Sequence, residues 1–219
     1  MNKIDLSEFD AIIFDMDGVL VDSEPLWKIS MEEVFHSMGS KLTKTDFQKT
    51  VGMRIDQVIS YWKRIEGWNE QVTEIQNQII DRMIELINEN GKPLPGVEDT
   101  VEYLSKLKIL GLASSSPNKL IESVLIKTQL RSHFRGIFSA ETEVYGKPHP
   151  AVYLTAAAKL GVEPQRCLVV EDSLNGIISG KAANMTVVCI PEITHLKNPK
   201  LILADNHFDS MTKFLEAIA

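Results

Sequence analysis

The pattern of apolar and polar positions begins with one short apolar run that ends in acids. Residues 11–14 are Ala-Ile-Ile-Phe, and they lead into Asp15 and Asp17, which Met16 separates and Gly18 follows. A short apolar run bounded by turn signals is typical of a buried strand, and open α/β sheets place their ligands at the carboxyl ends of such strands. We therefore expect both aspartates at the rim of a sheet.

The next part of the chain shows helical spacing. Apolar residues recur every three or four positions, and Ser23 stands where it can cap the first helix. Helices are expected over about 24–38, 43–49, 55–65 and 70–90, each with one apolar face. The segment Gly91–Gly96 then interrupts the pattern with two glycines and two prolines. Residues 22–91 are therefore expected to form a small helical domain with its own core.

Beyond this linker the pattern alternates between helix and strand. Strands are expected at residues 109–113, 136–140, 167–170 and 186–190, with a last one near 202–204. Helices are expected at about 97–107, 150–160 and 175–183, and from residues 117 and 211 onward. Alternating β and α units imply a parallel sheet with helices on both faces, which the first strand must join. The predicted fold is therefore α/β, with a core of residues 1–21 and 92–219 and the helical domain inserted after the first strand.

Composition narrows the class of protein. The 219 residues carry a net charge of −7, and 44% of them are hydrophobic. The acidic balance argues against a nucleic-acid partner, which calls for basic patches. No apolar run approaches the ~20 residues of a membrane span, and residues 1–10 lack the apolar centre of a signal peptide. We expect a cytoplasmic protein that is monomeric and has no membrane partner, with Cys167 and Cys189 buried and reduced.

Three interpretations of the Asp15/Asp17 pair compete. The first is a solvated surface turn. The second is a calcium loop, but that loop would need a ligand, a glycine and a glutamate where the chain has Val19, Leu20 and Leu26. The third is a phosphoryl-transfer site in which one aspartate is the nucleophile and the other the acid/base. The remaining strand ends have to decide among them.

Polar groups follow the other predicted strands in an order that suits phosphate chemistry. Ser114 ends the second strand, just before a helix N-terminus, where a phosphate oxygen is favoured. Lys147 follows the third strand and can act as a point charge for phosphate. Glu171 and Asp172 end the fourth strand, and acids on neighbouring strands make an oxygen-ligand site for Mg²⁺. Each signal alone also has a plain explanation, as a helix cap or a solvated side chain.

Together these motifs resemble the haloacid dehalogenase-like superfamily. Asp15-Met16-Asp17-Gly18-Val19 is similar to its first motif, Ser114 to the second, Lys147 to the third and Glu171-Asp172-Ser173 to the fourth. The resemblance implies a Rossmann-like parallel-sheet core with an inserted α-helical cap domain. The cap resembles that of the sugar-phosphatase and β-phosphoglucomutase branch. Residues 22–27, the segment 52–56 and Trp62 are particularly similar to bacterial hexitol and 2-deoxyglucose-6-phosphate phosphatases.

The resemblance implies a mechanism in which Asp15 is the nucleophile and forms an aspartyl-phosphate, while Asp17 is the general acid/base. It also implies a Mg²⁺ cofactor, with Mn²⁺ or Co²⁺ as alternatives, and a small sugar phosphate as substrate. The implied metal ligands are Asp15, the Asp17 carbonyl, Asp172 and, directly or through water, Glu171. The implied phosphate-binding groups are Ser114, Lys147 and the backbone N–H groups of Met16, Asp17 and Ser115, with Asn118 supporting them from behind. Arg54 is expected to reach the substrate, with Trp27 and Trp62 as walls, although all three could equally be structural.

Two other functions stay open. A β-phosphoglucomutase-like phosphotransferase would use the same core, but the related mutases carry a histidine where this chain has Trp27. A non-catalytic binding protein on the same fold is the second alternative, because a fold alone does not fix function. Dehalogenation is disfavoured by Asp17, since the dehalogenases of this superfamily lack an acid at that place.

Overall fold

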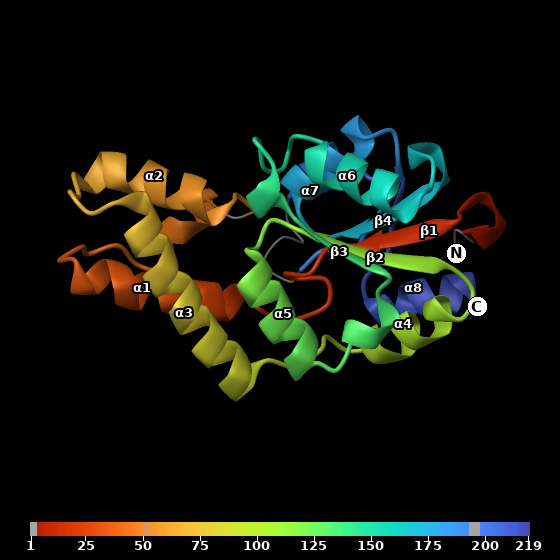
Figure 1. Ribbon diagram of the computed structural model, residues 1–219, viewed down its shortest axis with the longest axis horizontal. Helices are drawn as coiled ribbons and strands as arrows, with labels where there is room; N and C mark the ends of the chain where they lie inside the picture. The colour runs from red at the N-terminus through yellow and green to blue at the C-terminus, as the bar shows by residue number, and fades with distance from the viewer. Residues whose placement is uncertain (1–3, 51, 193–197) are drawn as a thin grey trace.

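The computed structural model describes residues 4–50, 52–192 and 198–219, and a six-stranded sheet runs through its centre (Figure 1). The strand order is β3-β2-β1-β4-β5-β6, and neighbouring strands are parallel. The strands are β1 (Ala11–Phe14), β2 (Ile109–Ser114), β3 (Gly136–Ser139), β4 (Cys167–Glu171), β5 (Thr186–Cys189) and β6 (Asn206–His207). The predicted α/β fold with a parallel sheet is confirmed.

Both faces of the sheet are covered by helices, as the continuous apolar character of β1 requires. Ile12 and Phe14 lie in one apolar cluster, and Ile13 lies in the cluster on the opposite face. The first face packs against α4 (Val97–Ser105), α5 (Asn118–Lys127) and α8 (Met211–Ile218), and the second against α6 (Ala151–Leu160) and α7 (Leu174–Ala182) (Figure 1). Cys167 and Cys189 are buried and form no disulfide.

The helical insertion lies beyond the carboxyl edge of the sheet (Figure 1). It consists of α1 (Glu24–Ser37), a 3₁₀ helix (Asp46–Thr50), α2 (Ile55–Glu66) and α3 (Val72–Asn90), and α3 packs alongside α5. Aromatic side chains fill its centre: the ring of Phe47 lies edge-on to those of Phe35 and Trp62. We call residues 22–91 the helical block.

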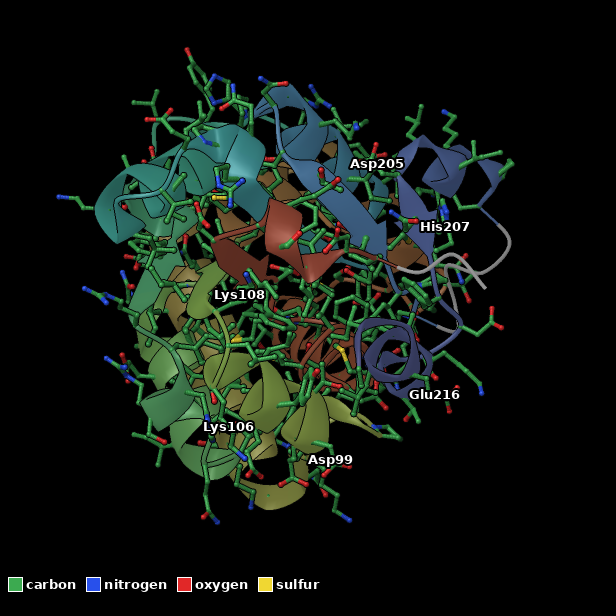
Figure 2. All side chains as sticks on the ribbon, turned by 90° about the vertical axis from the view of Figure 1, so that its right-hand side faces the viewer. Asp99, Lys106, Lys108, Asp205, His207 and Glu216 are labelled. Atoms are coloured by element: carbon green, nitrogen blue, oxygen red, sulfur yellow. The ribbon has the colours of Figure 1, made fainter. Side chains whose placement is uncertain are left out.

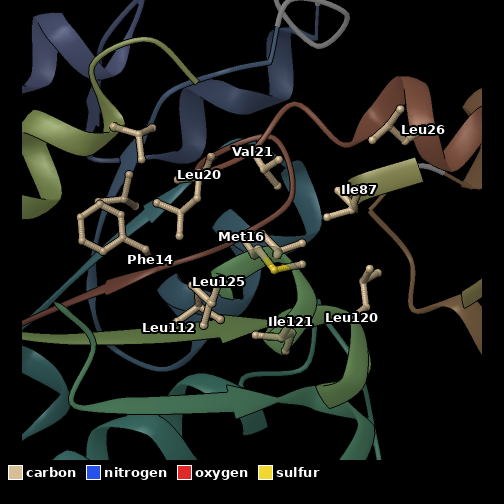
Figure 3. Close-up of a cluster of buried hydrophobic side chains, with 14 of the residues drawn as sticks. Phe14, Met16, Leu20, Val21, Leu26, Ile87, Leu112, Leu120, Ile121 and Leu125 are labelled. Atoms are coloured by element: carbon tan, nitrogen blue, oxygen red, sulfur yellow. The ribbon is translucent and has the colours of Figure 1, made fainter. Parts of the chain in front are cut away.

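The two linkers between the sheet and the helical block run side by side. Gly18 adopts a φ of +75° in the turn after β1, a conformation that residues with a side chain rarely adopt. Val21 then pairs with Pro93 of the returning linker, and the N–H of Leu94 donates to the carbonyl of Leu20. Figure 3 shows the apolar cluster beneath this crossing, where side chains of the outgoing linker meet those of β2 and α5. The crossing is thus anchored in the core.

Three local predictions differ from the structure. The strand expected near 202–204 is wrong: Pro199–Leu203 form a 3₁₀ helix and the strand follows at β6. Pro199 is suited to the first helical position, and the side chain of Asn198 caps the helix by accepting from the N–H of Lys200. The helix expected over 43–49 is the short 3₁₀ helix 46–50. Ser23 precedes α1, but its side chain makes no capping hydrogen bond.

The end of the molecule opposite the helical block carries charges of both signs. Figure 2 looks onto this end, where Lys106, Lys108, Asp99, Asp205 and Glu216 are labelled. The side chains of Lys106 and Glu216 are exposed, and they form surface ion pairs with Glu102 and Lys213, respectively. Among the helices of the described ranges, none combines the length and the hydrophobicity of a membrane-spanning segment.

Candidate active site

Asp15 directly follows β1, and its backbone N–H continues the sheet by donating to the carbonyl of Val170. Its side chain is buried beside Lys147, whose Nζ lies 2.8 Å from Oδ1 of Asp15 and 2.7 Å from Oε1 of Glu171. The same Nζ donates to the carbonyl of Ala113 at 3.1 Å. Lys147 therefore bridges acids from two neighbouring strands while staying 3% exposed.

Glu171 is occupied by this lysine and its surroundings. Oε1 accepts from Lys147 and from the hydroxyl of Tyr153 at 2.7 Å, and Oε2 accepts from the backbone N–H groups of Asp172 and Ser173 and from the Ser173 hydroxyl. A Cβ at position 176 would lie 1.7 Å from Oε1, so the carboxylate fills the space that Gly176 leaves. A carboxylate offers about four acceptor sites, and these are used here within the protein. Glu171 is therefore placed to hold Lys147.

The buried acids lie close enough together to shift one another's pKa. Carboxylate oxygens of Asp15, Glu171 and Asp172 all lie within 4.8 Å of one another. Burial raises the pKa of Asp15 above its ordinary value, Lys147 opposes this, and the neighbouring acids add to it. Lys147 in turn is held protonated, because Asp15 and Glu171 outweigh the effect of burial and raise its pKa.

These residues fit a divalent cation. Three carboxylates lie close together, and the ammonium group of Lys147 contacts two of them, which leaves two negative charges when all four groups are ionised. Such like charges are stable together only with a cation or with protons between them. Oxygen donors are the ligands that Mg²⁺ prefers. With Glu171 committed to Lys147, Asp15 and Asp172 are the side chains best suited to hold the ion.

Asp17 is oriented by hydrogen bonds from the helical block and from the core. Oδ1 accepts from the hydroxyl of Ser23 at 2.6 Å and from the indole Nε1 of Trp27 at 2.9 Å. Oδ2 accepts from the hydroxyl of Ser116 at 2.7 Å, and the Ser114 hydroxyl lies 3.4 Å away. Ser23 thus donates to Asp17 instead of capping α1. The Asp17 carboxylate is held where both parts of the protein meet.

The run of three serines that begins at the last residue of β2 contributes three different side chains. Ser114 is fully buried, and its hydroxyl accepts from the N–H of Ser116 at 3.0 Å. Ser116 donates to Asp17, as described above. Ser115 lines the cavity, and its buried hydroxyl has no hydrogen-bond partner among the residues that the structure describes. A buried hydroxyl without a partner is costly, so Ser115 is suited to a polar ligand.

A cavity lies between the sheet edge and the helical block. The core lines it with polar groups, among them Asp15, Asp17, Ser115, Lys147 and Asp172. The helical block lines it mainly with apolar side chains: Trp27, Met31, Phe47, Met53, Ile55 and Val58, together with Glu24, Thr50 and Gly52. The cavity therefore has one polar end and one largely apolar end.

Some predicted site residues lie elsewhere. Arg54 is not among the residues that line the cavity; its guanidinium binds Asp56 and two backbone carbonyls of the core. Asn118 is exposed and donates to the carboxylate of Glu141. Trp62 is buried within the helical block, so it is no wall of the cavity. The side chain of Met16 is buried in the apolar cluster below the linkers, which leaves the predicted role of its backbone N–H untouched (Figure 3).

Two residues at the site were missed from the sequence. Ser116 stands in the same serine run as Ser114 and Ser115, but the sequence pattern indicates no site role for it. Tyr153 lies on the buried face of α6, where its hydroxyl reaches Glu171. A hydroxyl on an otherwise apolar helix face is the signal that could have found it, because a buried tyrosine hydroxyl usually needs a partner.

Comparisons with known proteins agree with this arrangement. The family model for haloacid dehalogenase-like hydrolases matches residues 12–190, and the protein belongs to this family. Hexitol phosphatase B of Escherichia coli K12 is 42% identical over 206 residues, which cover 93% of each chain. A phosphorylated carbohydrates phosphatase of Thermotoga maritima is 29% identical over 80% of this chain and 82% of its own. The fold matches that of CbbY from Rhodobacter sphaeroides, with a TM-score of 0.85, 22% identity and 94% and 96% of the two chains covered.

Proposed function

We propose that the protein hydrolyses small sugar phosphates, such as hexose 6-phosphates, 2-deoxyglucose 6-phosphate or hexitol phosphates. The enzyme class, a phosphoric monoester hydrolase, is that of its relatives hexitol phosphatase B and the phosphorylated carbohydrates phosphatase. The observation that carries the proposal is the placement of two aspartates in one cavity. Asp15 lies against Lys147, and Asp17 is oriented by four side chains at the same rim.

The reaction proceeds in two steps. A carboxylate oxygen of Asp15 attacks phosphorus, the bond between phosphorus and the sugar oxygen breaks, and Asp17 gives that oxygen a proton. In the second step Asp17 takes a proton from a water molecule whose oxygen attacks phosphorus. The bond between phosphorus and the Asp15 oxygen breaks, which releases inorganic phosphate and restores the free Asp15 carboxylate. Ser114, Ser115, Lys147 and the backbone N–H groups of Met16, Asp17 and Ser115 bind the phosphoryl oxygens.

Asp15 and Asp172 would hold the metal ion, with the carbonyl of Asp17 as a further ligand. The ion, Mg²⁺ or alternatively Mn²⁺ or Co²⁺, supplies positive charge that offsets the crowding of the phosphoryl oxygens and the carboxylates. Glu171 contributes by holding Lys147 toward Asp15. The ammonium group neutralises Asp15, which lets its carboxylate approach a phosphate dianion.

We assign residues 22–91 to a cap domain over a core of residues 1–21 and 92–219. The cap's side of the cavity favours hydrolysis over mutase activity. Of the described residues that the cap contributes to the lining, Glu24 carries a charge and none is a lysine or arginine. A mutase has to hold a sugar bisphosphate, whose second phosphate would face this end. Lys28, which does not line the cavity, lies 3.4 Å from the carboxylate of Glu24 and offsets part of its charge. Among its described lining residues the cap thus offers a second phosphate no cation, whereas hydroxyls of a neutral sugar can donate to Glu24.

A panel of monophosphates tests the proposal. Purified protein with Mg²⁺ should release phosphate from hexose and hexitol phosphates faster than from nucleotides, and Asp15→Asn should abolish the release. Asp10→Asn is the matched control, because Asp10 is exposed and pairs with Arg166 away from the cavity. Accumulation of glucose 6-phosphate from β-glucose 1-phosphate would identify a mutase instead, and no turnover of any ester would leave the binding-protein alternative.

A further inference from the structure

Arg54 connects the helical block to the core through one guanidinium group. Its Nε and Nη2 bind the two carboxylate oxygens of Asp56 at 2.7 and 2.9 Å. Its Nη1 donates across to the core, to the carbonyls of Ala140 and Glu143, each at 2.9 Å. The Arg54 side chain is 16% exposed, so these bonds are largely shielded from water.

Arg54 lies between two residues that line the cavity, so its bonds to the core also hold the cavity wall. Its neighbours Met53 and Ile55 line the cavity, and Arg54 itself precedes α2. On the core side, Ala140 and Glu143 belong to the loop that leads from β3 to Lys147. The Cβ of Arg54 is so near this loop that a Cβ on Gly146 would lie 3.2 Å from it. One side chain thus joins two segments that contribute to the site.

Little of the guanidinium is left for a ligand. It has five N–H groups, and four hydrogen bonds to the protein already use most of them. An ion pair that also joins the two parts, between Lys119 of α5 and Asp81 of α3, is exposed. Exposed ion pairs contribute little, whereas shielded bonds from a charged donor are stronger. Arg54 is therefore the stronger of these two connections.

We propose that Arg54 is a positioning residue that fastens the cavity-lining segment of the helical block onto the loop before Lys147, and that it does not contact the substrate. Its kinetic consequence rests on the proposed phosphatase function. If turnover requires the fastened arrangement, the apparent kcat/KM scales with the fraction of molecules that adopt it. Loosening the fastening then lowers kcat/KM by the same factor for every phosphate ester.

Arg54→Lys separates this role from substrate binding. Lysine keeps the positive charge but offers a single ammonium, which cannot reach both Asp56 oxygens and both carbonyls in the geometry of the fork. We expect kcat/KM to fall by about tenfold, the factor that corresponds to one charge-assisted hydrogen bond. The loss should be equal for a hexitol phosphate and for p-nitrophenyl phosphate, which has no sugar hydroxyls. Arg64→Lys is the matched control, because Arg64 is exposed on α2 and stacks on Tyr61.

A distance measurement tests the fastening without relying on activity. Spin labels at Ile65→Cys in α2 and Ala158→Cys in α6 report the separation of the two parts, because both positions are exposed and the native cysteines are buried. We expect Arg54→Lys to lengthen or broaden the distance distribution, and Arg64→Lys to leave it unchanged.

An unchanged distribution in Arg54→Lys, or a loss of activity confined to sugar phosphates, would overturn the proposal. If the wild-type protein hydrolyses no ester, the proposed function fails, and the distance distribution alone still decides whether Arg54 fastens the two parts.

Discussion

Replacing Lys147 with methionine should destabilise the fold strongly. Methionine keeps an unbranched side chain of similar length but removes the ammonium group. That group bridges Asp15 and Glu171 at 2.8 and 2.7 Å and lies 4.7 Å above the ring of Tyr153. Without it, two buried carboxylates lose their common partner.

The surroundings of Lys147 determine how much the substitution lowers the free energy of unfolding. Removing one partner of a buried ion pair costs about 3–5 kcal/mol, because the remaining charge stays buried and uncompensated. Two features favour the lower end of this range. Asp15 can take up a proton, since its pKa is already raised by burial and the nearby acids. Glu171 keeps the three hydrogen bonds to its Oε2. We therefore expect a loss of about 3 kcal/mol in the free energy of unfolding.

Urea unfolding followed by circular dichroism, with EDTA present to exclude metal ions, measures this loss. Lys106→Met is the matched control: its Nζ lies 2.7 Å from Glu102, but the two side chains are 67% and 60% exposed. An exposed pair of this kind contributes about 0.5 kcal/mol or less. Adding Glu171→Gln to Lys147→Met should recover part of the stability, because it removes one of the uncompensated charges, while activity stays absent.

A Lys147→Met variant that loses no more stability than Lys106→Met would refute this reasoning. It would mean that the buried acids are neutral in the folded protein and that Lys147 does not balance them. A double variant less stable than Lys147→Met would contradict the assignment of Glu171 as the partner of Lys147.

Three further predictions concern the residues around the nucleophile. Trp27→Phe keeps the cavity wall but removes the indole bond to Asp17, so kcat/KM for hexitol phosphates should fall by about tenfold. The kcat/KM for p-nitrophenyl phosphate should fall less, because nitrophenolate leaves without a proton in the first step; equal losses would speak against this role of Trp27. Gly18→Ala should cost about 1–3 kcal/mol in urea unfolding, since the residue has a φ of +75° and its Cβ would lie 2.5 Å from Oδ2 of Asp172; wild-type stability would be contrary to this view. EDTA should abolish activity and Mg²⁺ restore it, with Asp172→Asn raising the half-saturating Mg²⁺ concentration by at least about tenfold; an unchanged Mg²⁺ titration would remove Asp172 from the ligand set.

The fold and the centre of the site could be predicted from the sequence because both follow from local patterns. Continuous apolar runs such as 167–170 indicate strands buried on both faces, and helices between them imply parallel pairing. Parallel strands share one carboxyl edge, so the side chains after β1, β2 and β4 had to meet. The structure accordingly brings Asp15, Ser114 and Asp172 to one edge.

The predicted site residues that lie outside the cavity, and the residues that the sequence did not indicate, depend on partners far away in the chain. Arg54 stands between two residues that line the cavity, but its guanidinium donates to the backbone carbonyls of Ala140 and Glu143, which follow 86 and 89 residues later in the chain. The side-chain amide of Asn118 likewise donates to a distant residue, the carboxylate of Glu141. Ser116 belongs to the site because its hydroxyl donates to the carboxylate of Asp17, which lies 99 residues earlier in the chain. Side-chain partners of this kind are set by tertiary structure, on which local spacing carries no information.

The nucleophile assignment is tested most directly by trapping the covalent intermediate. Rapid acid quenching of the reaction with p-nitrophenyl phosphate and Mg²⁺, followed by peptide mass spectrometry, locates any phosphoryl group on the chain. We predict one phosphoryl group on the peptide that contains Asp15, its absence in Asp15→Asn, and its accumulation in Asp17→Asn, where no base activates the attacking water. Product formation without a phosphorylated peptide, or a phosphoryl group on a residue other than Asp15, would contradict the account.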